Sequence, residues 1–499
     1  MTIDPQAPAF EPFYSMLEGE NLLDRLAAGL IGKDTIIEGP FGPKALIYAD
    51  YVASGRALMQ IERFMIEHVL PFYANSHTQA SYCGAAMTLM REQARGIIAR
   101  SCGAGAEHAV IFAGGGATAG INRLVSLFGL TDAVAKGQPV RVLVGPYEHH
   151  SNILPWRESG AEFIEIPEDE LGGPCQQRLK EELAAAPKDC KLVCSFSAAS
   201  NVTGITSDVA TLTRIAKAAG ALVIWDYAGG APYLPIAATP EPDCAIDAIV
   251  LSPHKFIGGP GATGVLIVRR DAVTATRPTW PGGGTVRFVT PESHDYSDSL
   301  EAREEAGTPN VVGDIRAALA FIVKDAIGAT DMAARNAVLA ARARTKWSGH
   351  EAIELLGAPS PDRLPIFSFR IRDGAGGYVH QQLVTRLLSD VFGIQARGGC
   401  ACAGPYVHRL LAIEPKASAR LRAAILAGEE VEKPGFTRLN FSVLMDDETV
   451  DYIIDAVLDL AVRAPRLAAH YDLDPARAIF TPKARDDNNH SDAGSEAVA

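Results

Sequence analysis

The sequence has little of the features that mark several special classes of protein. Cysteine is sparse, with 8 scattered residues in 499, so the chain is not a small disulfide-bonded scaffold. Acidic residues outnumber basic ones, 59 to 46, and the net charge of −13 argues against a nucleic-acid partner. No apolar run is long enough to cross a membrane, and no signal peptide is recognisable. We therefore expect a cytoplasmic protein with free thiols and no membrane partner.

The composition that is present indicates a globular protein with a large core. Hydrophobic residues make up 47% of the chain and charged residues 21%, and the length suggests about two to three domains. Short apolar runs alternate with segments of helical periodicity, which indicates an α/β fold with a mostly parallel sheet covered on both faces. The runs predicted as strands are Ala109–Ala113, Val140–Val144, Phe163–Ile166, Leu192–Phe196, Leu222–Trp225, Ala248–Leu251 and Gly264–Val268.

Four segments follow from this pattern. Residues 1–44 form a leader that we expect to pack with a smaller domain. Residues 45–310 form the large α/β domain, whose first strand is predicted at Lys44–Asp50. Residues 311–482 begin with a long Ala-rich linking helix and continue as the smaller α+β domain. The tail, residues 483–499, is polar, and we expect it to be disordered.

A lysine stands where one predicted buried strand ends. Lys255 follows the apolar run that ends at Leu251, with Ser252 and His254 beside it and a glycine-rich turn after it. Burial would lower the pKa of the amine and make it nucleophilic, which suits a Schiff base with an aldehyde cofactor. The alternative is a lysine at a strand end that simply reaches water.

An aspartate follows the preceding predicted strand. Asp226 and Lys255 would lie at the carboxyl edge of one parallel sheet, where open α/β sheets bind ligands. The carboxylate could pair with a protonated pyridine nitrogen, and the small Ala228 would let a flat ring lie against it. The alternative for such an aspartate is a helix N-cap.

Two more strand ends carry polar groups. The turn Gly114–Gly116 opens a helix after a strand, so its amides and the Thr118 hydroxyl could bind a phosphate, although a dinucleotide site is the other interpretation. His149 and His150 follow the next strand, and an imidazole there could stack on a ring or move protons. We predict no metal site, because no third ligand has suitable spacing. A solvent-exposed pair of histidines is the alternative.

Together these motifs resemble the fold-type I enzymes of the class V aminotransferase family, which depend on pyridoxal 5′-phosphate (PLP). Within that family the chain is most similar to the cysteine desulfurases of the selenocysteine-lyase-like branch. The resemblance implies a Schiff-base lysine, Lys255, and a homodimer with sites between its subunits. The cofactor-binding residues that it implies are Ala117, Thr118, His149, Asn201, Asp226, Ala228, Ser252, His254, Lys255 and Thr285.

Two C-terminal motifs concern the substrate. The stretch Arg397–Pro405 resembles the desulfurase loop that carries the thiolate, and it aligns Cys402 with that catalytic thiolate. The strand around Arg438 resembles the one whose arginine binds the substrate carboxylate, for which a guanidinium is well shaped. The substrate-binding residues implied by the resemblance are His77, Asn201, Arg397 and Arg438.

Several positions depart from the family pattern. Gly229 stands where many desulfurases have glutamine, Ala117 replaces a common hydroxyl residue, and Cys400 and Ala401 replace histidines. The segment 405–435 is longer than in compact desulfurases. The interpretation of the two cysteines as small buried hydrophobic residues therefore stays open.

The resulting hypothesis is a PLP-dependent cysteine desulfurase that moves sulfur from L-cysteine to an enzyme persulfide and releases alanine, with a sulfur-acceptor protein as partner. The alternative is a class V aminotransferase, epimerase or lyase that acts on another amino acid, with Cys402 not catalytic. A non-catalytic binding module on an enzyme fold is a third interpretation, against which Lys255, Asp226 and Arg438 argue together.

Overall fold

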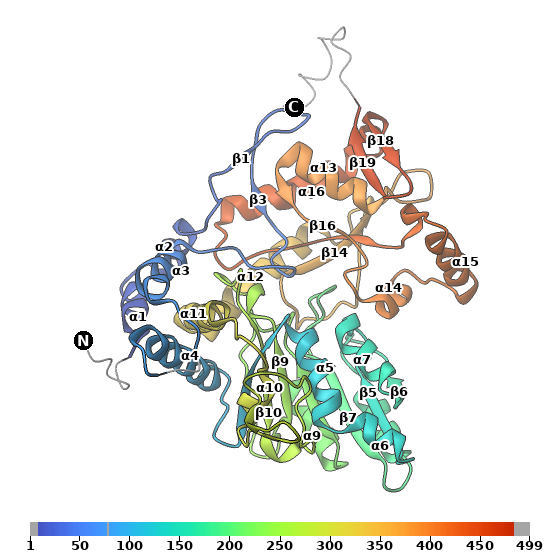
Figure 1. Cartoon of the computed structure of the whole chain (residues 1–499). Helices are drawn as coiled ribbons and strands as arrows, with labels where there is room; N and C mark the ends of the chain where they lie inside the picture. Colours follow the sequence, from blue (N-terminus) through green and yellow to red (C-terminus); the bar gives the residue numbers. More distant parts are fainter. Residues whose placement is uncertain (1–7, 77–78, 484–499) are drawn as a thin grey trace.

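The computed structural model describes residues 8–76 and 79–483. Figure 1 shows two units, a lower one around a seven-stranded sheet and an upper one around a four-stranded sheet, with the N-terminal helices along the left-hand side. Within the described residues, no helix is long and apolar enough to cross a membrane. The tail predicted to be disordered lies, from residue 484 on, outside the described residues.

The large sheet is mostly parallel, as predicted. Only β10 runs against its neighbours, and the other six strands share one direction. Each of the seven apolar runs predicted as strands forms a strand of this sheet, and all but the edge strand β6, which is only partly buried, are mostly buried. In spatial order the strands are β4 (His108–Gly114), β10 (Gly264–Arg269), β9 (Ala248–Leu251), β8 (Leu222–Asp226), β7 (Lys191–Ser197), β5 (Val140–Val144) and β6 (Glu162–Glu165).

Hydrophobic clusters cover both faces of this sheet. One cluster includes Ile121 and Leu124 of α5 (Ala117–Leu127), packed with the inner strands. The other includes α11 (Val311–Ile327), which contacts α4 (Tyr82–Ser101). Further helices of this domain are α6 (Leu130–Ala135), α7 (Leu154–Glu158), α8 (Gln176–Ala184), α9 (Val209–Ala218) and α10 (Leu300–Glu304).

The smaller domain is an antiparallel sheet with helices packed on it. Its core is centred on Trp347, whose ring lies 5.1 Å from that of Phe367 and 6.2 Å from that of Phe441. The strands in order are β13 (Ile353–Leu355), β14 (Ile366–Ile371), β17 (Phe436–Asn440) and β16 (Arg397–Gly399). The main helices are α12 (Ala329–Trp347), α13 (Gln381–Phe392) and α16 (Asp447–Leu467).

The strand predicted at Lys44–Asp50 does not join the large sheet. It forms two short strands instead, β2 (Lys44–Ala45) and β3 (Ile47–Tyr48), and β3 pairs in parallel with β15 (Ile394–Gln395) of the smaller domain. Its residues are only partly buried, so the pattern of a fully buried inner strand is missing. The polypeptide therefore crosses from one domain to the other at residues 47–50.

The N-terminal leader also differs from the expectation that it packs with the smaller domain. Helix α1 (Glu11–Leu17) contacts α3 (Met59–Phe64) and α11, and Phe13 belongs to the core cluster of the large domain. The physical reason is aromatic packing, because the rings of Phe10 and Phe13 lie 5.9 and 5.4 Å from that of Phe64. The end of the leader does meet the smaller domain, because Phe41 packs against its core cluster and β2 contacts α13.

The predicted linking helix is two helices. Helix α11 ends at Ile327 and α12 begins at Ala329, with Gly328 between them at a φ of +84°. A left-handed residue stops an α-helix, and glycine adopts that conformation without a Cβ penalty. The alanine-rich pattern continues through the break, which is why the sequence predicted one helix.

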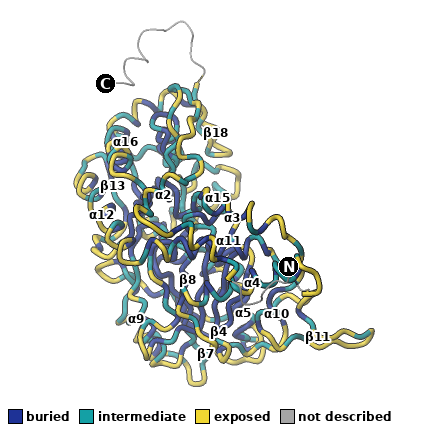
Figure 2. The backbone as a smooth tube through the Cα atoms, turned by 90° about the vertical axis from the view of Figure 1, so that its left-hand side faces the viewer, coloured by how far each residue is buried: buried dark blue, intermediate teal, exposed yellow. Residues whose placement is uncertain are grey.

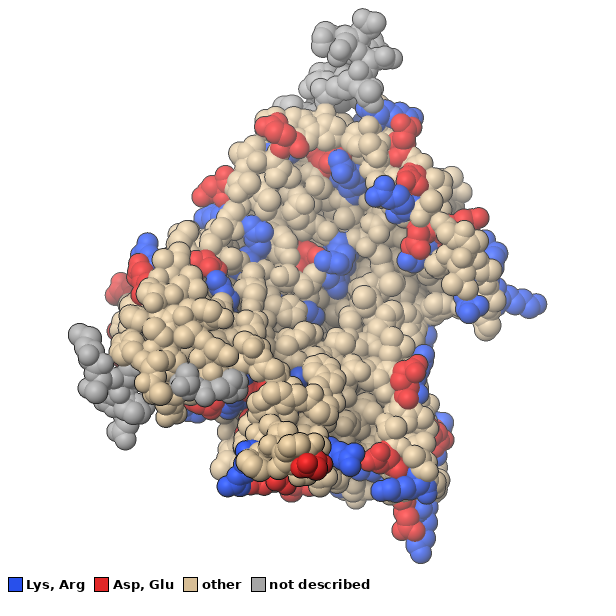
Figure 3. All heavy atoms as spheres, viewed as in Figure 1, with Lys and Arg blue, Asp and Glu red and all other residues tan. Residues whose placement is uncertain are grey.

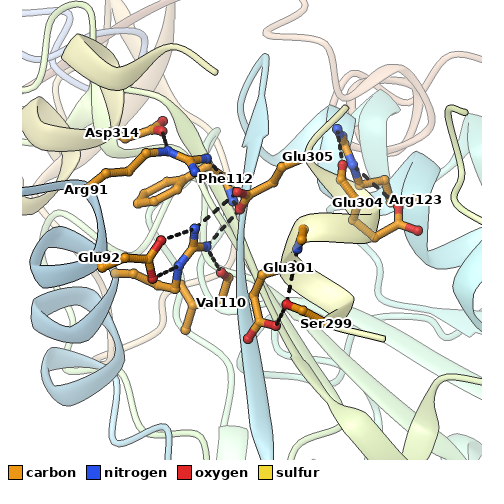
Figure 4. Close-up of polar contacts among 12 residues, drawn as sticks. Arg91, Glu92, Val110, Phe112, Arg123, Ser299, Glu301, Glu304, Glu305 and Asp314 are labelled. Atoms are coloured by element: carbon orange, nitrogen blue, oxygen red, sulfur yellow. Dashed lines mark hydrogen bonds and ion pairs between the residues drawn. The ribbon is translucent and has the colours of Figure 1, made fainter. Parts of the chain in front are cut away.

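A buried ion network ties α4 to the first turn of α11 and to the chain before it (Figure 4). Arg91 contacts Asp314 at 2.7 Å, and Arg91 and Arg95 both pair with Glu305, which also accepts the amide of Phe112 at 2.7 Å. The Arg91, Glu305 and Asp314 side chains are each less than 10% exposed. The network fixes the segment that follows α10 against the large sheet.

Short elements complete the structure. A hairpin of β11 and β12 extends away from the body, as Figure 2 shows, and its outer residues are exposed. The remaining elements are α2 (Leu22–Ala28), β1 (Ile36–Ile37), η1 (Met65–Val69), η2 (Leu70–Phe72), η3 (His150–Asn152), η4 (Pro253–Lys255), η5 (Arg270–Ala272), β11 (Val286–Val289), β12 (His294–Tyr296), α14 (Gly404–Leu410), α15 (Pro415–Leu426), η6 (Glu430–Glu432), η7 (Ala468–His470), β18 (Tyr471–Asp474) and β19 (Ile479–Pro482).

Candidate active site

A cavity of about 300 Å³ lies where the carboxyl ends of the parallel strands face the smaller domain. Its walls come from segments that follow β4, β5, β7, β8 and β9, and from the loop after β16. This is the sheet edge at which the sequence placed the polar residues. The lining residues include Ala117, Thr118, His149, Ser151, Asn201, Asp226, Ala228, Ser252, His254, Lys255, Arg397, Cys402 and Arg438.

The described residues that line the cavity include one lysine, Lys255, and one aspartate, Asp226. Lys255 ends the single turn η4 after β9, and burial together with the charge of Arg438 lowers the pKa of its amine, which Asp226 opposes. Asp226 is the last residue of β8, and burial raises the pKa of its carboxyl despite the hydrogen bond from the Ala228 amide at 2.8 Å. The site thus holds an amine biased toward its neutral, nucleophilic form and a buried acid.

A compact cradle lies at the start of α5. The Ala117 amide donates to Ser252 Oγ at 3.0 Å, and Gly116 has a φ of +75°. A Cβ on Gly116 would lie 3.0 Å from Ser252 Oγ and 3.1 Å from His254 Cε1, so only glycine leaves this space open. Hydroxyl, imidazole and helix-terminal amide donors around a small space suit a phosphate.

His149 is held in one tautomer. Its Nδ1 accepts the amide of Ser151 at 3.1 Å, so the ring proton resides on Nε2. Burial and the nearby charge of Lys255 lower the pKa of His149 to about 4, and the imidazole is therefore neutral at pH 7. A neutral, partly buried ring is suited to stack on a heterocycle.

Glu148 lies behind this wall and is fully buried. It accepts hydrogen bonds from the Ser197 amide at 2.8 Å and from Ser197 Oγ and Asn152 Nδ2 at 2.6 Å each. Burial raises the pKa of Glu148 to about 7, and the negative charge of Asp226 acts in the same direction. The residue ties the ends of β5 and β7 together and so positions His149, its neighbour in the chain.

Two arginines share one carboxylate on the other side of the cavity. Arg438 Nη2 donates to Asp50 Oδ1 at 2.9 Å, and Arg397 Nε donates to Asp50 Oδ2 at 2.8 Å. Arg438 also donates to the carbonyl of Asn201 at 3.0 Å. Its Nε is buried and has no hydrogen-bond partner among residues 8–76 and 79–483, and the Arg438 side chain lines the cavity.

The two cysteines of the loop after β16 lie in different surroundings. Cys402 is exposed and lines the cavity, whereas Cys400 packs beside the hydrophobic cluster of Tyr147 and Phe436. The loop is anchored by the bond from His150 N to the Cys402 carbonyl at 2.8 Å. Ala401 and Cys402 both have positive φ, 50° and 54°, so the chain turns sharply enough to separate the two thiols.

Comparison with known proteins agrees with this geometry. A family model described as "Aminotransferase class-V" matches residues 47–453. The chain belongs to the class V aminotransferase family. A cysteine desulfurase of Haloferax volcanii is 27% identical, over 83% of this chain and 88% of that protein.

Solved structures show the same fold. The apo structure of a cysteine desulfurase of Thermococcus onnurineus has a TM-score of 0.69 and 23% sequence identity. The match covers 84% of this chain and 95% of that one. A cysteine desulfurase of Escherichia coli has a TM-score of 0.64 and 23% identity, with coverage of 84% and 94%. The predicted fold-type I class V architecture is confirmed, and with it the dependence on PLP that defines the family.

The residues present fit this cofactor. A lysine, a buried carboxylate and a donor-lined cradle meet in one cavity, and a Cβ on Gly116 would crowd the Ser252 and His254 side chains of that cradle. Ala228 leaves the wall near Asp226 free of a bulky side chain. The lysine suits the aldehyde of PLP, the buried carboxylate suits its ring nitrogen, and the cradle suits its phosphate.

One predicted site residue, Thr285, does not line this cavity, and another, His77, lies outside the described residues. Thr285 is buried, but its hydroxyl donates to the carbonyl of Gly282 at 2.7 Å within its own turn. All the other predicted site residues line the cavity, and their roles stay predictions.

Sequence reasoning missed three functional candidates, Asp50, Glu148 and Ser151. Asp50 was the last residue of a strand predicted for the large domain, and that assignment hid its position beside Arg438. Glu148 and Ser151 flank the histidine pair that drew attention. The available signal for Glu148 was a carboxylate placed shortly after the end of a buried strand.

Proposed function

We propose that this class V enzyme is a PLP-dependent cysteine desulfurase, which takes sulfur from L-cysteine onto Cys402 and releases alanine. The observation that carries the proposal is that Lys255, Arg438 and Cys402 line one cavity although they come from three distant parts of the chain. The similarity to cysteine desulfurases over most of the chain supports it. The shared cavity separates Cys402 from Cys400 as the candidate nucleophile.

The cofactor residues have the following proposed roles. When bound, PLP supplies an aldehyde for a Schiff base with an amine and a ring that accepts electrons. Lys255 provides that amine and, once freed, moves the substrate's Cα proton as base and acid. Asp226 keeps the ring nitrogen protonated. His149 stacks on the ring, Ala228 packs against it, Asn201 contacts cofactor or substrate, and Ala117 N, Thr118, Ser252 and His254 hold the phosphate.

The substrate residues act on the two ends of cysteine. Arg438 binds the carboxylate, and Arg397 lies beside it on the same Asp50 carboxylate. The Cys402 thiolate attacks the substrate's sulfur, so that an S–S bond forms as the Cβ–S bond breaks. The electron pair left on Cβ takes up a proton, which yields alanine and a persulfide without any external oxidant. A sulfur-acceptor protein then takes the terminal sulfur from Cys402.

A second function is favoured by one observation. Gly229 lines the cavity where many desulfurases have glutamine, and a Cβ there would meet only ordinary contacts at 3.5 Å from Ala199 O and Asn201 Cβ. The lost amide leaves room for a larger substrate. The alternative function is therefore an aminotransferase, epimerase or lyase on another amino acid, in which Cys402 is not catalytic.

We also propose a homodimer, in which Thr285 approaches the cofactor of the partner and His77 contacts substrate. Exposed apolar side chains support this, since Ile66 is 62%, Leu70 50% and Tyr73 52% exposed. Figure 3 shows few charged side chains over the neighbouring α3 and α4. The projecting β11–β12 hairpin, next to Thr285, exposes Phe288 and Val289 as well. A cytoplasmic location is supported by all eight cysteines being free.

The test is product analysis with L-cysteine. The wild-type protein is expected to form one alanine per persulfide. Cys402→Ser should form alanine at least about a hundredfold more slowly than wild type. The matched control, Cys400→Ser, should form it at a rate within about twofold of wild type. Full alanine formation by Cys402→Ser would overturn the sulfur-transfer assignment in favour of the alternative. Lys255→Ala that still fixes PLP after borohydride treatment and dialysis would overturn the role of the lysine.

A further inference from the structure

Ser151 stands between two residues of the proposed cofactor site. Its Oγ lies 2.6 Å from Thr118 Oγ1 and 3.0 Å from His149 Nδ1, and all three side chains line the same cavity. Thr118 is in the first turn of α5, whereas Ser151 is in η3, which follows β5. The two hydroxyls therefore join the phosphate cradle to a second, separate loop.

The hydroxyl of Ser151 has no structural task of its own in this turn. The local cap of η3 is made by His149 Nδ1, which accepts the Ser151 amide at 3.1 Å. Within the described part of the chain, the hydroxyl makes contacts only with Thr118 and His149, and none with a backbone carbonyl. A serine that served only to shape the turn would bond to nearby backbone.

The proton of this hydroxyl is available to the cradle. Because the Ser151 amide already donates to His149 Nδ1, that ring nitrogen has its donor without the hydroxyl. The Ser151 hydroxyl is thus free to donate to Thr118 Oγ1 across the contact of 2.6 Å. Thr118 can then donate its own proton to a phosphate oxygen while it accepts from Ser151, and such chains strengthen each bond.

The cradle has no side-chain hydroxyl at position 117, where the family turn commonly has one. Ala117 opens α5, and its amide is engaged with Ser252 Oγ. Ser151 supplies a hydroxyl to this space from another loop. We propose that Ser151 belongs to the phosphate cradle, as a positioning residue that orients the Thr118 hydroxyl toward the phosphate.

This inference rests on the proposed PLP site, so its test separates the two. The apoprotein of the full chain is titrated with PLP and with pyridoxal, which lacks the phosphate, for wild type, Ser151→Ala and the control Ser101→Ala. Ser101 is bonded to Asp325 and does not line the cavity. Without Ser151 the Thr118 hydroxyl loses its fixed orientation, and loss of the hydrogen bond from Thr118 to the charged phosphate corresponds to about a tenfold weaker affinity.

The expected result is about tenfold weaker PLP binding by Ser151→Ala, with pyridoxal binding and the control within about twofold of wild type. Nitrogen NMR of labelled histidine is expected to show the same His149 tautomer in both proteins. Equal PLP affinity of wild type and Ser151→Ala would overturn the inference, and so would an equal loss with pyridoxal or a changed tautomer. A wild-type protein that binds no PLP would instead overturn the proposed function.

Discussion

Arg438 donates to Asp50 across 2.9 Å, although 388 positions of the chain separate the two residues. Asp50 follows β3 in the N-terminal part, and Arg438 lies in β17 of the smaller domain. Both side chains are buried, so the pair is held in one geometry. Asp50 thereby fixes the guanidinium that is proposed to bind the substrate carboxylate.

Replacing Asp50 by asparagine should weaken substrate binding without affecting the cofactor. Arg438 would lose its charged partner and its fixed orientation, so the KM for cysteine is expected to rise about tenfold or more. PLP absorbance should stay unchanged, because Asp50 does not line the cavity. Steady-state kinetics measures this, with Asp298→Asn as a control from an exposed ion pair. An unchanged KM with a reduced kcat would contradict the prediction.

Two glycines at the end of β4 allow a matched test of the cradle. Gly114 and Gly116 both have positive φ, +87° and +75°, so alanine at either should cost about 1 kcal/mol of stability. Only the Cβ at Gly116 would approach Ser252 and His254, since nothing lies within 4 Å of one at Gly114. PLP titration should therefore show about tenfold weaker binding for Gly116→Ala alone. Equal affinities in the two variants would speak against a phosphate at this position.

The buried Glu148 should make stability depend on pH. The pKa of its carboxyl in the folded protein, about 7, lies above the ordinary value of 4.5. The stability that this group contributes is therefore complete below pH 4.5 and is lost as pH rises through about 7.

Glu148→Gln removes that titration, so wild type should lose stability relative to the variant between pH 5 and 8. Urea unfolding at several pH values measures the difference in the free energy of unfolding between the two proteins. The contributions of the other titrating groups are the same in both proteins and cancel in this difference. Any constant cost of the amide shifts all points equally. Parallel stability curves for the two proteins would show that Glu148 does not titrate in this range.

The ion network of Figure 4 offers a contrast between two carboxylates that share Arg95. Glu305 is only 6% exposed and also holds Arg91, whereas Glu92 is 56% exposed. Glu305→Gln should lower the free energy of unfolding by about 3 kcal/mol, because it removes the buried charge that Arg91 and Arg95 share and leaves Arg91 with Asp314 alone and Arg95 with the exposed Glu92. Glu92→Gln should change it by less than about 1 kcal/mol. Similar effects of the two substitutions in urea unfolding would refute this assignment.

Much of the large domain is predictable because its strands are continuous apolar runs. The run Val140–Val144 is buried at every position, and such runs separated by helical patterns leave few topologies. The same logic brought Asp226 and Lys255 together, since parallel strands end at one edge. The site residues at strand ends were therefore accessible from the sequence.

Contacts between distant segments were not accessible in this way. The pairing of β3 with β15 rests on two residues in each strand, too few for a periodic signal. Asp50 depends on that pairing for its place beside Arg438. The bond between Ser151 and Thr118 depends on how two separate loops meet, which no local pattern specifies.

The crossing of the chain at residues 47–50 limits how the protein can be divided. A fragment that begins after residue 310 would contain Arg397, Arg438 and Cys402, but it would lack Asp50 and the strand that pairs with β15. Two positively charged guanidinium groups would then repel each other without a common counter-ion, and one strand edge would be left open. Removal of residues 1–50, by proteolysis or gene truncation, would take away Asp50 and β3 in the same way and disable the proposed substrate capture, even though none of the described residues among them lies in the large sheet.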